Sequence, residues 1–132
     1  MISVDIVTPY RKILENATAT SVRLPAAKGE MEVLPGHAEL LTLLSTGVLG
    51  IRRDEGEKRF AISYGFAEIR KDKILVLAET CEESSEIDLE RAKQAQKQAE
   101  EHLISQITTE SFRKYQLKLE RAVTRQKVAK GD

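Results

Sequence analysis

The hydrophobic pattern of this 132-residue chain changes its period within the stretch from Thr80 to Ala92. Before this stretch apolar residues mostly alternate with polar ones; after it they recur every three or four residues, with no Gly or Pro until Gly131. A period of two indicates β-strands, whereas a period of 3.6 indicates α-helices. The stretch is therefore predicted to join a strand-rich part, residues 1–84, to a helical part, residues 85–132.

The first part consists of short apolar segments separated by turn signals such as Pro35-Gly36 and Lys71-Asp72. Many short strands with frequent turns are typical of an antiparallel β-sandwich or barrel. A part of this size can bury a modest hydrophobic core. Strands are predicted over residues 2–7, with an end near Pro9, and over 17–24, 30–34, 40–44, 48–51, 60–64, 66–70 and 73–78.

The second part is predicted to form an antiparallel pair of helices, because a short connection separates two helical patterns. Asp88 is expected to cap the first helix, which runs to about Ile104, and Thr108 or Thr109 to start the second. Burying Ala gains little compared with about 1.5–3 kcal/mol for Leu or Phe. Because the stripe between the helices is mostly Ala, the pair is expected to detach from the sandwich and change partners. The stripe consists of Ala92, Ala95, Ala99 and Leu103 on the first helix, and Phe112, Tyr115, Leu119, Ala122 and Ala129 on the second.

Charged residues of the helical part also recur at helical spacing. Asp88 and Arg91 are three residues apart, and Arg121 and Arg125 are four apart, so each pair shares one helix face. In an antiparallel hairpin the three arginines converge beside the N-terminus of the first helix, where guanidiniums and free amides suit phosphate oxygens. Asp88 and Glu82 would accept hydrogen bonds from a base amino group or a ribose hydroxyl. The alternative is that all of these are solvated charges paired within their own helices.

Charge and hydropathy argue against two classes of partner. Lys and Arg number 21, as do Asp and Glu, so net charge gives no reason to expect binding to nucleic acid or to an anionic membrane surface. No run approaches the roughly 18 apolar residues of a membrane span, and the N-terminus lacks the pattern of a signal peptide. We therefore expect no nucleic-acid partner and no direct membrane insertion.

The sequence contains no recognisable catalytic or metal-binding set. It lacks both a P-loop and a Gly-x-Ser-x-Gly motif, and His37 lies far from His102. His102 is expected on a solvated helix face. Core or helix–helix contacts, rather than stacking platforms, are expected for Tyr64, Phe112 and Tyr115. The single cysteine, Cys81, is interpreted as a small packing residue in a reducing compartment. A non-catalytic protein that requires no metal is predicted.

The segment that begins at Glu30 reads Glu-Met-Glu-Val-Leu-Pro-Gly-His-Ala-Glu-Leu-Leu-Thr. Together with several other segments, it resembles the epsilon subunit of F-type ATP synthases of the bacterial type, whose run at this place is Leu-Pro-Gly-His-x-Pro-Leu-Leu-Thr. The order and spacing of the matching segments agree over essentially the whole chain. The others are Ile62-Ser-Tyr-Gly-Phe-Ala-Glu-Ile, Leu77-Ala-Glu-Thr, Ile87-Asp-Leu-Glu-Arg-Ala and Glu120-Arg-Ala-Val-Thr-Arg-Gln-Lys-Val-Ala.

The resemblance implies an α+β fold, a ten-stranded β-sandwich followed by a two-helix hairpin. It implies a non-catalytic subunit of the central stalk, at the cytoplasmic face of the bacterial inner membrane. Its sandwich would bind the gamma subunit and sit on the ring of c-subunits, with Glu30 and His37 at that contact. Its hairpin would fold against the sandwich, or extend into the alpha/beta catalytic headpiece and block ATP hydrolysis.

In some bacterial members of this family the compact form binds ATP without hydrolysing it. The resemblance thus implies ATP as a regulatory ligand and no required cofactor. One departure is Gln98, which stands where the ATP-binding members carry an arginine. The nucleotide-binding residues implied are Glu82, Ile87, Asp88, Arg91, Ala92, Arg121 and Arg125.

Two alternatives stay open. The first is a structural rotor connector whose hairpin senses no nucleotide, which Gln98 favours. The second is a stand-alone ligand-binding sandwich with a coiled-coil tail, which the near-heptad spacing of the second helix would allow.

Overall fold

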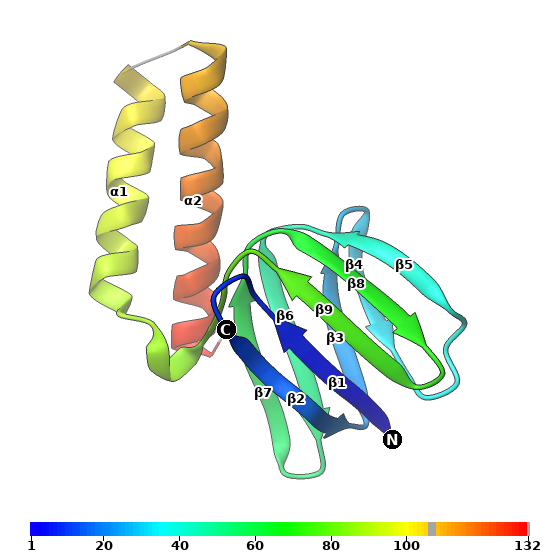
Figure 1. Cartoon of the computed structure of the whole chain (residues 1–132). Coiled ribbons are helices and arrows are strands. Elements are labelled where there is room, and N and C mark those ends of the chain that lie inside the picture. Colours follow the sequence, from blue (N-terminus) through cyan, green and yellow to red (C-terminus); the bar gives the residue numbers. More distant parts are fainter. Residues whose placement is uncertain (106–107, 132) are drawn as a thin grey trace.

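A computed structural model describes residues 1–105 and 108–131 of the chain. Ten strands are followed by a 3₁₀ turn and two antiparallel helices, so the predicted α+β sandwich with a C-terminal hairpin is confirmed (Figure 1). Residues 106–107 and 132, which belong to the predicted helical part, lie outside the described residues. The elements are β1 (Ile2–Val7), β2 (Lys12–Ala19), β3 (Ser21–Ala26), β4 (Gly29–Val33), β5 (Leu40–Leu44), β6 (Gly47–Arg53), β7 (Gly56–Ile62), β8 (Gly65–Arg70), β9 (Lys73–Ala78), β10 (Cys81–Glu83), η1 (Ser84–Glu86), α1 (Leu89–Ser105) and α2 (Thr109–Lys130).

The ten strands form one hydrogen-bonded sheet that folds over on itself into two layers (Figure 1). Their order is β10-β7-β6-β3-β5-β8-β9-β1-β2, with β4 paired to β3 off this path. The described pairings are antiparallel except that of β1 with β9, which run parallel. The first strand therefore lies beside the ninth, and this long-range pairing links the two ends of the sandwich.

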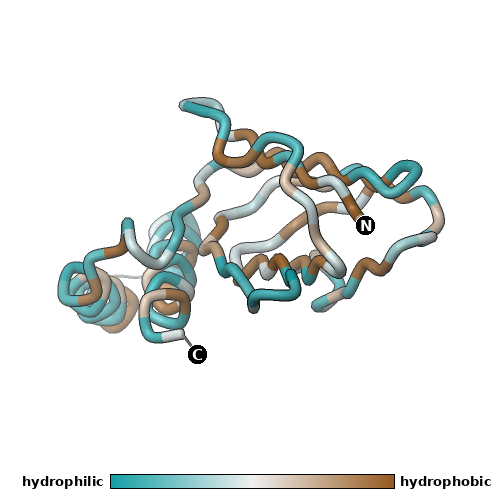
Figure 2. The backbone as a smooth tube through the Cα atoms, turned by 90° about the horizontal axis from the view of Figure 1, so that it is seen from below, coloured by the Kyte–Doolittle hydropathy of each residue, from teal (hydrophilic) through white to brown (hydrophobic). Residues whose placement is uncertain are grey.

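The core forms because apolar side chains alternate along each strand and share one face of the pleated sheet. In β1, Ile2, Val4 and Ile6 are buried while the residues between them are half-buried. Figure 2 shows the same alternation of hydrophobic and hydrophilic positions in the strands, and mostly hydrophilic helices. The largest fully buried side chains are Ile2, Val4, Ile6, Val22, Leu24, Val33, Leu49, Ile51, Phe60, Ile62, Ile69 and Ile74.

Two strands were predicted as one. The segment 17–24 was predicted to be a single strand, but β2 ends at Ala19 and β3 begins at Ser21. The first residues of β2 escaped detection because this strand lies at the end of the sheet and is largely polar and exposed. Asn16 adopts a positive φ of 51°, and register shifts interrupt the β1–β2 pairing. Both features break the regular alternation on which the prediction depended.

The pairing of β8 with β9 depends on a tight turn at one end and on a close backbone contact at the other. Lys71 and Asp72 both adopt positive φ, as a two-residue hairpin turn with the right twist requires. The Asp72 carboxylate also accepts a hydrogen bond of 2.7 Å from the Gly36 amide in the β4–β5 loop. At Gly65 an added Cβ would lie 1.9 Å from the carbonyl oxygen of Leu77, so only glycine fits there.

The hairpin is attached to the sandwich through the C-terminal part of α2, which packs on β6 and β7, while its tip projects away (Figure 1). Thr124 and Val128 are buried in addition to Ala122. The predicted stripe is correct for the buried residues Ala92, Ala99 and Ala122, but Phe112 is 45% exposed. The stripe therefore ends before the tip of the hairpin.

Candidate functional site

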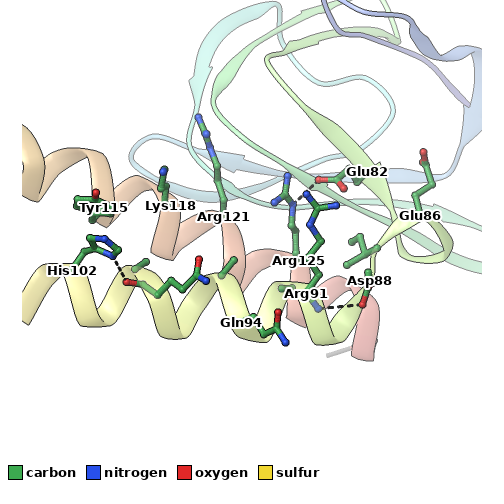
Figure 3. A pocket seen from close by; sticks show the side chains of 15 residues that line it. Glu82, Glu86, Asp88, Arg91, Gln94, His102, Tyr115, Lys118, Arg121 and Arg125 are labelled. Atoms are coloured by element: carbon green, nitrogen blue, oxygen red, sulfur yellow. Dashed lines mark hydrogen bonds and ion pairs between the residues drawn. The ribbon is translucent and has the colours of Figure 1, made fainter.

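A cleft of about 850 Å³ runs between α1 and α2 and opens beside the segment that joins them to the sandwich. Its volume is within the range of small-molecule sites. Figure 3 shows the side chains that line it, which come from both helices, from β10 and from the segment before α1. Every residue of the predicted nucleotide set lines this cleft: Glu82, Ile87, Asp88, Arg91, Ala92, Arg121 and Arg125.

Asp88 caps the first helix, as predicted. Its Oδ1 accepts a hydrogen bond of 3.1 Å from the Arg91 amide, and its carbonyl oxygen accepts one of 3.0 Å from the Ala92 amide. Ile87 precedes it in an extended conformation and is half-buried. The cap places the exposed Arg91 side chain one turn into α1, close to the positive end of the helix dipole. This end of the cleft is therefore suited to an anion.

Arg121 and Arg125 reach the same region from α2 because the helices are antiparallel. Each already has a carboxylate partner on the sandwich side. The Nε of Arg125 lies 2.6 Å from Glu82, and Nη2 of Arg121 lies 3.8 Å from Glu79. Both pairs are partly exposed, so each contributes up to about 1 kcal/mol. They nevertheless hold α2 against the sandwich, and an anionic ligand would have to compete with these carboxylates.

Tyr64 adds a third contact to the Arg121–Glu79 pair. The guanidinium of Arg121 lies 5.9 Å from the Tyr64 ring centroid. The hydrogen bond from its hydroxyl to the Glu79 carboxylate raises the pKa of Tyr64. Its side chain is exposed rather than part of a core, so the expectation of a core position is wrong.

Toward the tip of the hairpin, the cleft is lined by residues that the sequence did not indicate as a site. The ring of His102 stacks on that of Tyr115, with centroids 4.3 Å apart and an angle of 15° between the planes. His102 donates from Nδ1 to the carbonyl oxygen of Gln98, 2.7 Å away. His102 is thus exposed, as expected for a solvated face, but also engaged between helices. Lys118 lies three residues from both Tyr115 and Arg121, and this spacing was the available signal.

An ion pair connects the segment before α1 to the loop after β1. The Arg11 guanidinium lies 2.5 Å from the Glu86 carboxylate, which also accepts a hydrogen bond of 3.1 Å from the Glu83 amide. These two interactions, the amide first, lower the pKa of Glu86. The carboxylate therefore stays ionised and holds the joint between sandwich and hairpin.

Glu30 and His37 lie outside the cleft, on another part of the sandwich. Glu30 is in β4, with its carboxylate 3.7 Å from Arg23, whereas His37 follows the other end of the strand. The His37 ring contacts the Ala38 carbonyl oxygen at 2.7 Å from Nδ1. A surface that includes both residues must therefore run along β4.

Neither a metal centre nor a reactive thiol emerges from the part of the chain that is described. Residues 1–105 and 108–131 contain no cluster of three His, Cys, Asp or Glu side chains placed to hold a metal ion. Cys81 is buried, and this burial raises its pKa to about 12, so the thiol stays protonated. It is a packing residue, as predicted.

An exposed apolar surface covers the outer face of β5, β8 and β9. Leu41 and Leu43 are 66% and 67% exposed, and Phe66 and Leu75 are more than one-third exposed. The strand register places Leu43 opposite Phe66, and Leu41 opposite Glu68, which faces Leu75. We call these four residues the leucine face. Sequence analysis missed it because apolar runs in strands usually indicate burial.

Two protein-family models and several curated sequences match this chain over nearly its whole length. The family described as "ATP synthase, Delta/Epsilon chain, beta-sandwich domain" matches residues 1–84, and "ATP synthase, Delta/Epsilon chain, long alpha-helix domain" matches residues 85–130. The ATP synthase epsilon chain of Geotalea uraniireducens is 43% identical over 97% of this chain and 93% of that protein. The epsilon chain of Moorella thermoacetica is 42% identical, over 97% of this chain and 96% of that protein.

Two solved structures share the fold at low sequence identity. A chain of the Euglena gracilis mitochondrial ATP synthase, OSCP/F1/c-ring assembly, superimposes with a TM-score of 0.84 at 22% identity, over 93% of this chain and 78% of that one. A chain of the Tetrahymena thermophila mitochondrial ATP synthase central stalk and c-ring gives a TM-score of 0.65 at 17% identity, over 93% of this chain and 96% of that one.

Proposed function

The chain belongs to the ATP synthase delta/epsilon family, as an epsilon chain of the bacterial type, and on this premise we propose that it is a non-catalytic regulatory subunit of the rotor. Its sandwich binds the gamma subunit and the c-ring, and its hairpin controls ATP hydrolysis. The subunit is held peripherally at the cytoplasmic face of the bacterial inner membrane. Within the described residues, neither helix is long and apolar enough to cross a membrane.

The leucine face is the proposed contact with the gamma subunit. Monomeric proteins rarely leave a contiguous apolar surface of this kind uncovered. Leu41 and Leu43 would be buried there, with Glu68 among them to fix the register of the contact. The polar strand β4, with Glu30 and then His37, is left for the c-ring. The two surfaces use different strands, so one small domain can bind both partners at once.

The cleft carries the second half of the proposal, which is that the compact hairpin binds ATP without hydrolysing it. The observation that carries it is the convergence of Arg91, Arg121 and Arg125 at the capped start of α1, beside Glu82 and Asp88. Guanidiniums and helix amides bind phosphate oxygens, and carboxylates accept hydrogen bonds from base or ribose. The site contains no P-loop lysine that would activate a bound nucleotide for hydrolysis.

Binding across both helices makes ATP a regulator of hairpin position. A ligand that binds only the compact hairpin shifts the equilibrium between compact and extended hairpin by its difference in affinity for the two states. A difference in binding free energy of about 5.5 kcal/mol is needed to change the ratio of the two states from 1:99 to 99:1. When ATP is scarce, the hairpin leaves the sandwich, extends into the alpha/beta headpiece and prevents wasteful hydrolysis. The contact of α2 with the sandwich is small and consists of Thr124, Val128 and two partly exposed ion pairs. The free-energy difference between the compact and extended hairpin is therefore small enough for a ligand to change.

A rotor connector without nucleotide sensing is the second candidate. The ion pairs Arg121–Glu79 and Arg125–Glu82 hold the hairpin against the sandwich with no ligand present. In this alternative the two arginines are structural, and the position of the hairpin responds to the gamma subunit alone.

Calorimetric titration of the full chain with ATP and ADP, with and without magnesium, separates the two candidates. Arg91→Ala should raise the dissociation constant for ATP by roughly 10- to 100-fold, because it removes a charge-assisted contact. Lys93→Ala is the matched control: it removes the same charge from α1, but Lys93 does not line the cleft. An unchanged ATP affinity in Arg91→Ala would show that the assigned site is wrong. No binding by the wild type up to millimolar ATP would establish the connector.

A further inference from the structure

The cleft continues beyond the three arginines toward the tip of the hairpin, and its two ends differ in charge. The acidic lining residues are confined to the end near Asp88. Past Gln98 the lining is neutral or basic, and the cleft is closed where His102 stacks on Tyr115. A nucleotide in this cleft is therefore oriented, with its nucleoside near the carboxylates and its phosphates directed toward the stacked rings.

The basic residues on α2 form a row along this direction. Lys118, Arg121 and Arg125 are three and four residues apart, so they lie on one face and span about 10 Å along the helix axis. Arg125 is paired with Glu82 at 2.6 Å and Arg121 with Glu79 at 3.8 Å. Lys118 forms no ion pair within 4.0 Å in the described part of the chain. Its charge is thus the least neutralised of the row.

Lys118 lies at the far end of the row, between the stacked rings and Arg121 (Figure 3). Its Nζ is 5.4 Å from the Tyr115 ring centroid, so the ammonium lies at the end of the cleft that the stacked rings close. Gln98, on the opposite helix, lines the same region and carries no charge. In this orientation, phosphates that begin at Arg91 and Arg125 and extend along the cleft bring the last group of a triphosphate nearest to Lys118.

We propose that Lys118 binds the terminal phosphate of a nucleoside triphosphate and that this contact makes the cleft discriminate ATP from ADP. The inference rests on the proposed nucleotide function and adds to it a residue that determines specificity. It places the discrimination between ATP and ADP on α2.

The test compares Lys118→Gln with the wild-type chain by calorimetric titration with ATP and with ADP in the presence of magnesium. Lys114→Gln is the matched control, because Lys114 has its Nζ 5.6 Å from the same Tyr115 ring but does not line the cleft. Lys118→Gln should weaken ATP binding roughly tenfold and change ADP binding by less than about twofold. Lys114→Gln should leave both affinities near those of the wild type. Both lysines are exposed, so the thermal midpoint should be unchanged in either variant.

Three results would overturn the inference while leaving nucleotide binding intact. They are an unchanged ATP affinity in Lys118→Gln, an equal loss for ATP and ADP, and an equal effect of Lys114→Gln, which would indicate only long-range electrostatics. If the wild type binds neither nucleotide, the proposed nucleotide function itself fails, and the role of Lys118 fails with it.

Discussion

Val128 is the residue whose truncation should release the hairpin without unfolding the sandwich. It is 2% exposed and sits on the part of α2 that packs against β6 and β7. Val128→Ala removes two carbon atoms from this interface. At about 0.8 kcal/mol for each buried carbon, the docked state loses about 1.6 kcal/mol, and the cavity left behind adds to this loss.

A loss of this size corresponds to a shift of roughly tenfold in the docking equilibrium. The amides of a released hairpin lose their protection from hydrogen exchange, because isolated helices of this length are only marginally stable in water. Amide hydrogen exchange measured on the full chain should therefore accelerate about tenfold in α1 and α2. The strands β1, β8 and β9, which carry the core residues Val4, Ile69 and Ile74, should keep their exchange rates, because α2 packs on β6 and β7 instead.

Lys127→Ala is the matched control for this experiment. Lys127 is the preceding residue on α2 and is exposed, so its truncation should leave exchange in the helices unchanged. Equal acceleration in strands and helices after Val128→Ala would mean that hairpin and sandwich unfold as one unit. No acceleration anywhere would mean that the ion pairs, rather than apolar contacts, carry the attachment. Either result would refute the view that the hairpin is held weakly through α2.

Three further predictions concern the joint and the sheet. Asp88→Ala should lower the helicity of the hairpin and cost about 1 kcal/mol, whereas Asp88→Asn, which keeps the cap, should recover the helicity measured by circular dichroism. Because the pKa of Glu86 is lowered in the folded chain, its stabilisation is present above its unfolded pKa and is lost as pH falls through the folded value. The acid dependence of exchange in α1 should therefore disappear in Glu86→Gln; a dependence that persists would assign it to another group. Gly65→Ala should destabilise the sandwich by about 3 kcal/mol in urea unfolding, because the added Cβ meets the Leu77 carbonyl oxygen, and a near-neutral result would contradict that contact.

The strands and helices were largely predictable because their signals are local. Alternation in β1 and the three-to-four spacing after Asp88 reflect which face of each element is buried, and the order of residues alone records this. The cap at Asp88 was also predictable, since capping involves only the first turn of the helix. The boundary between β2 and β3 was not, because Thr20, where the chain passes from one strand to the other, lies in a Thr- and Val-rich stretch without Gly or Pro.

The candidate site could be predicted only in part. The convergence of Arg91, Arg121 and Arg125 follows from spacing together with the antiparallel arrangement of the helices. The pairing of Arg121 with Glu79 does not follow, because it joins α2 to a strand end that is distant in sequence. The stacking of His102 on Tyr115 was missed for the same reason, since it depends on the distance between two helices.

The sequence by itself determined the family, the change from strands to helices and the charges available to a nucleotide. These are properties of residue type and of spacing along one element. The tertiary structure alone decided that β1 pairs in parallel with β9, that Leu41 and Leu43 face outward, and that Lys118 forms no ion pair with a carboxylate of the described residues. Each of these depends on which distant segment lies alongside, and the free energy that selects that neighbour comes from packing the whole sandwich and hairpin together.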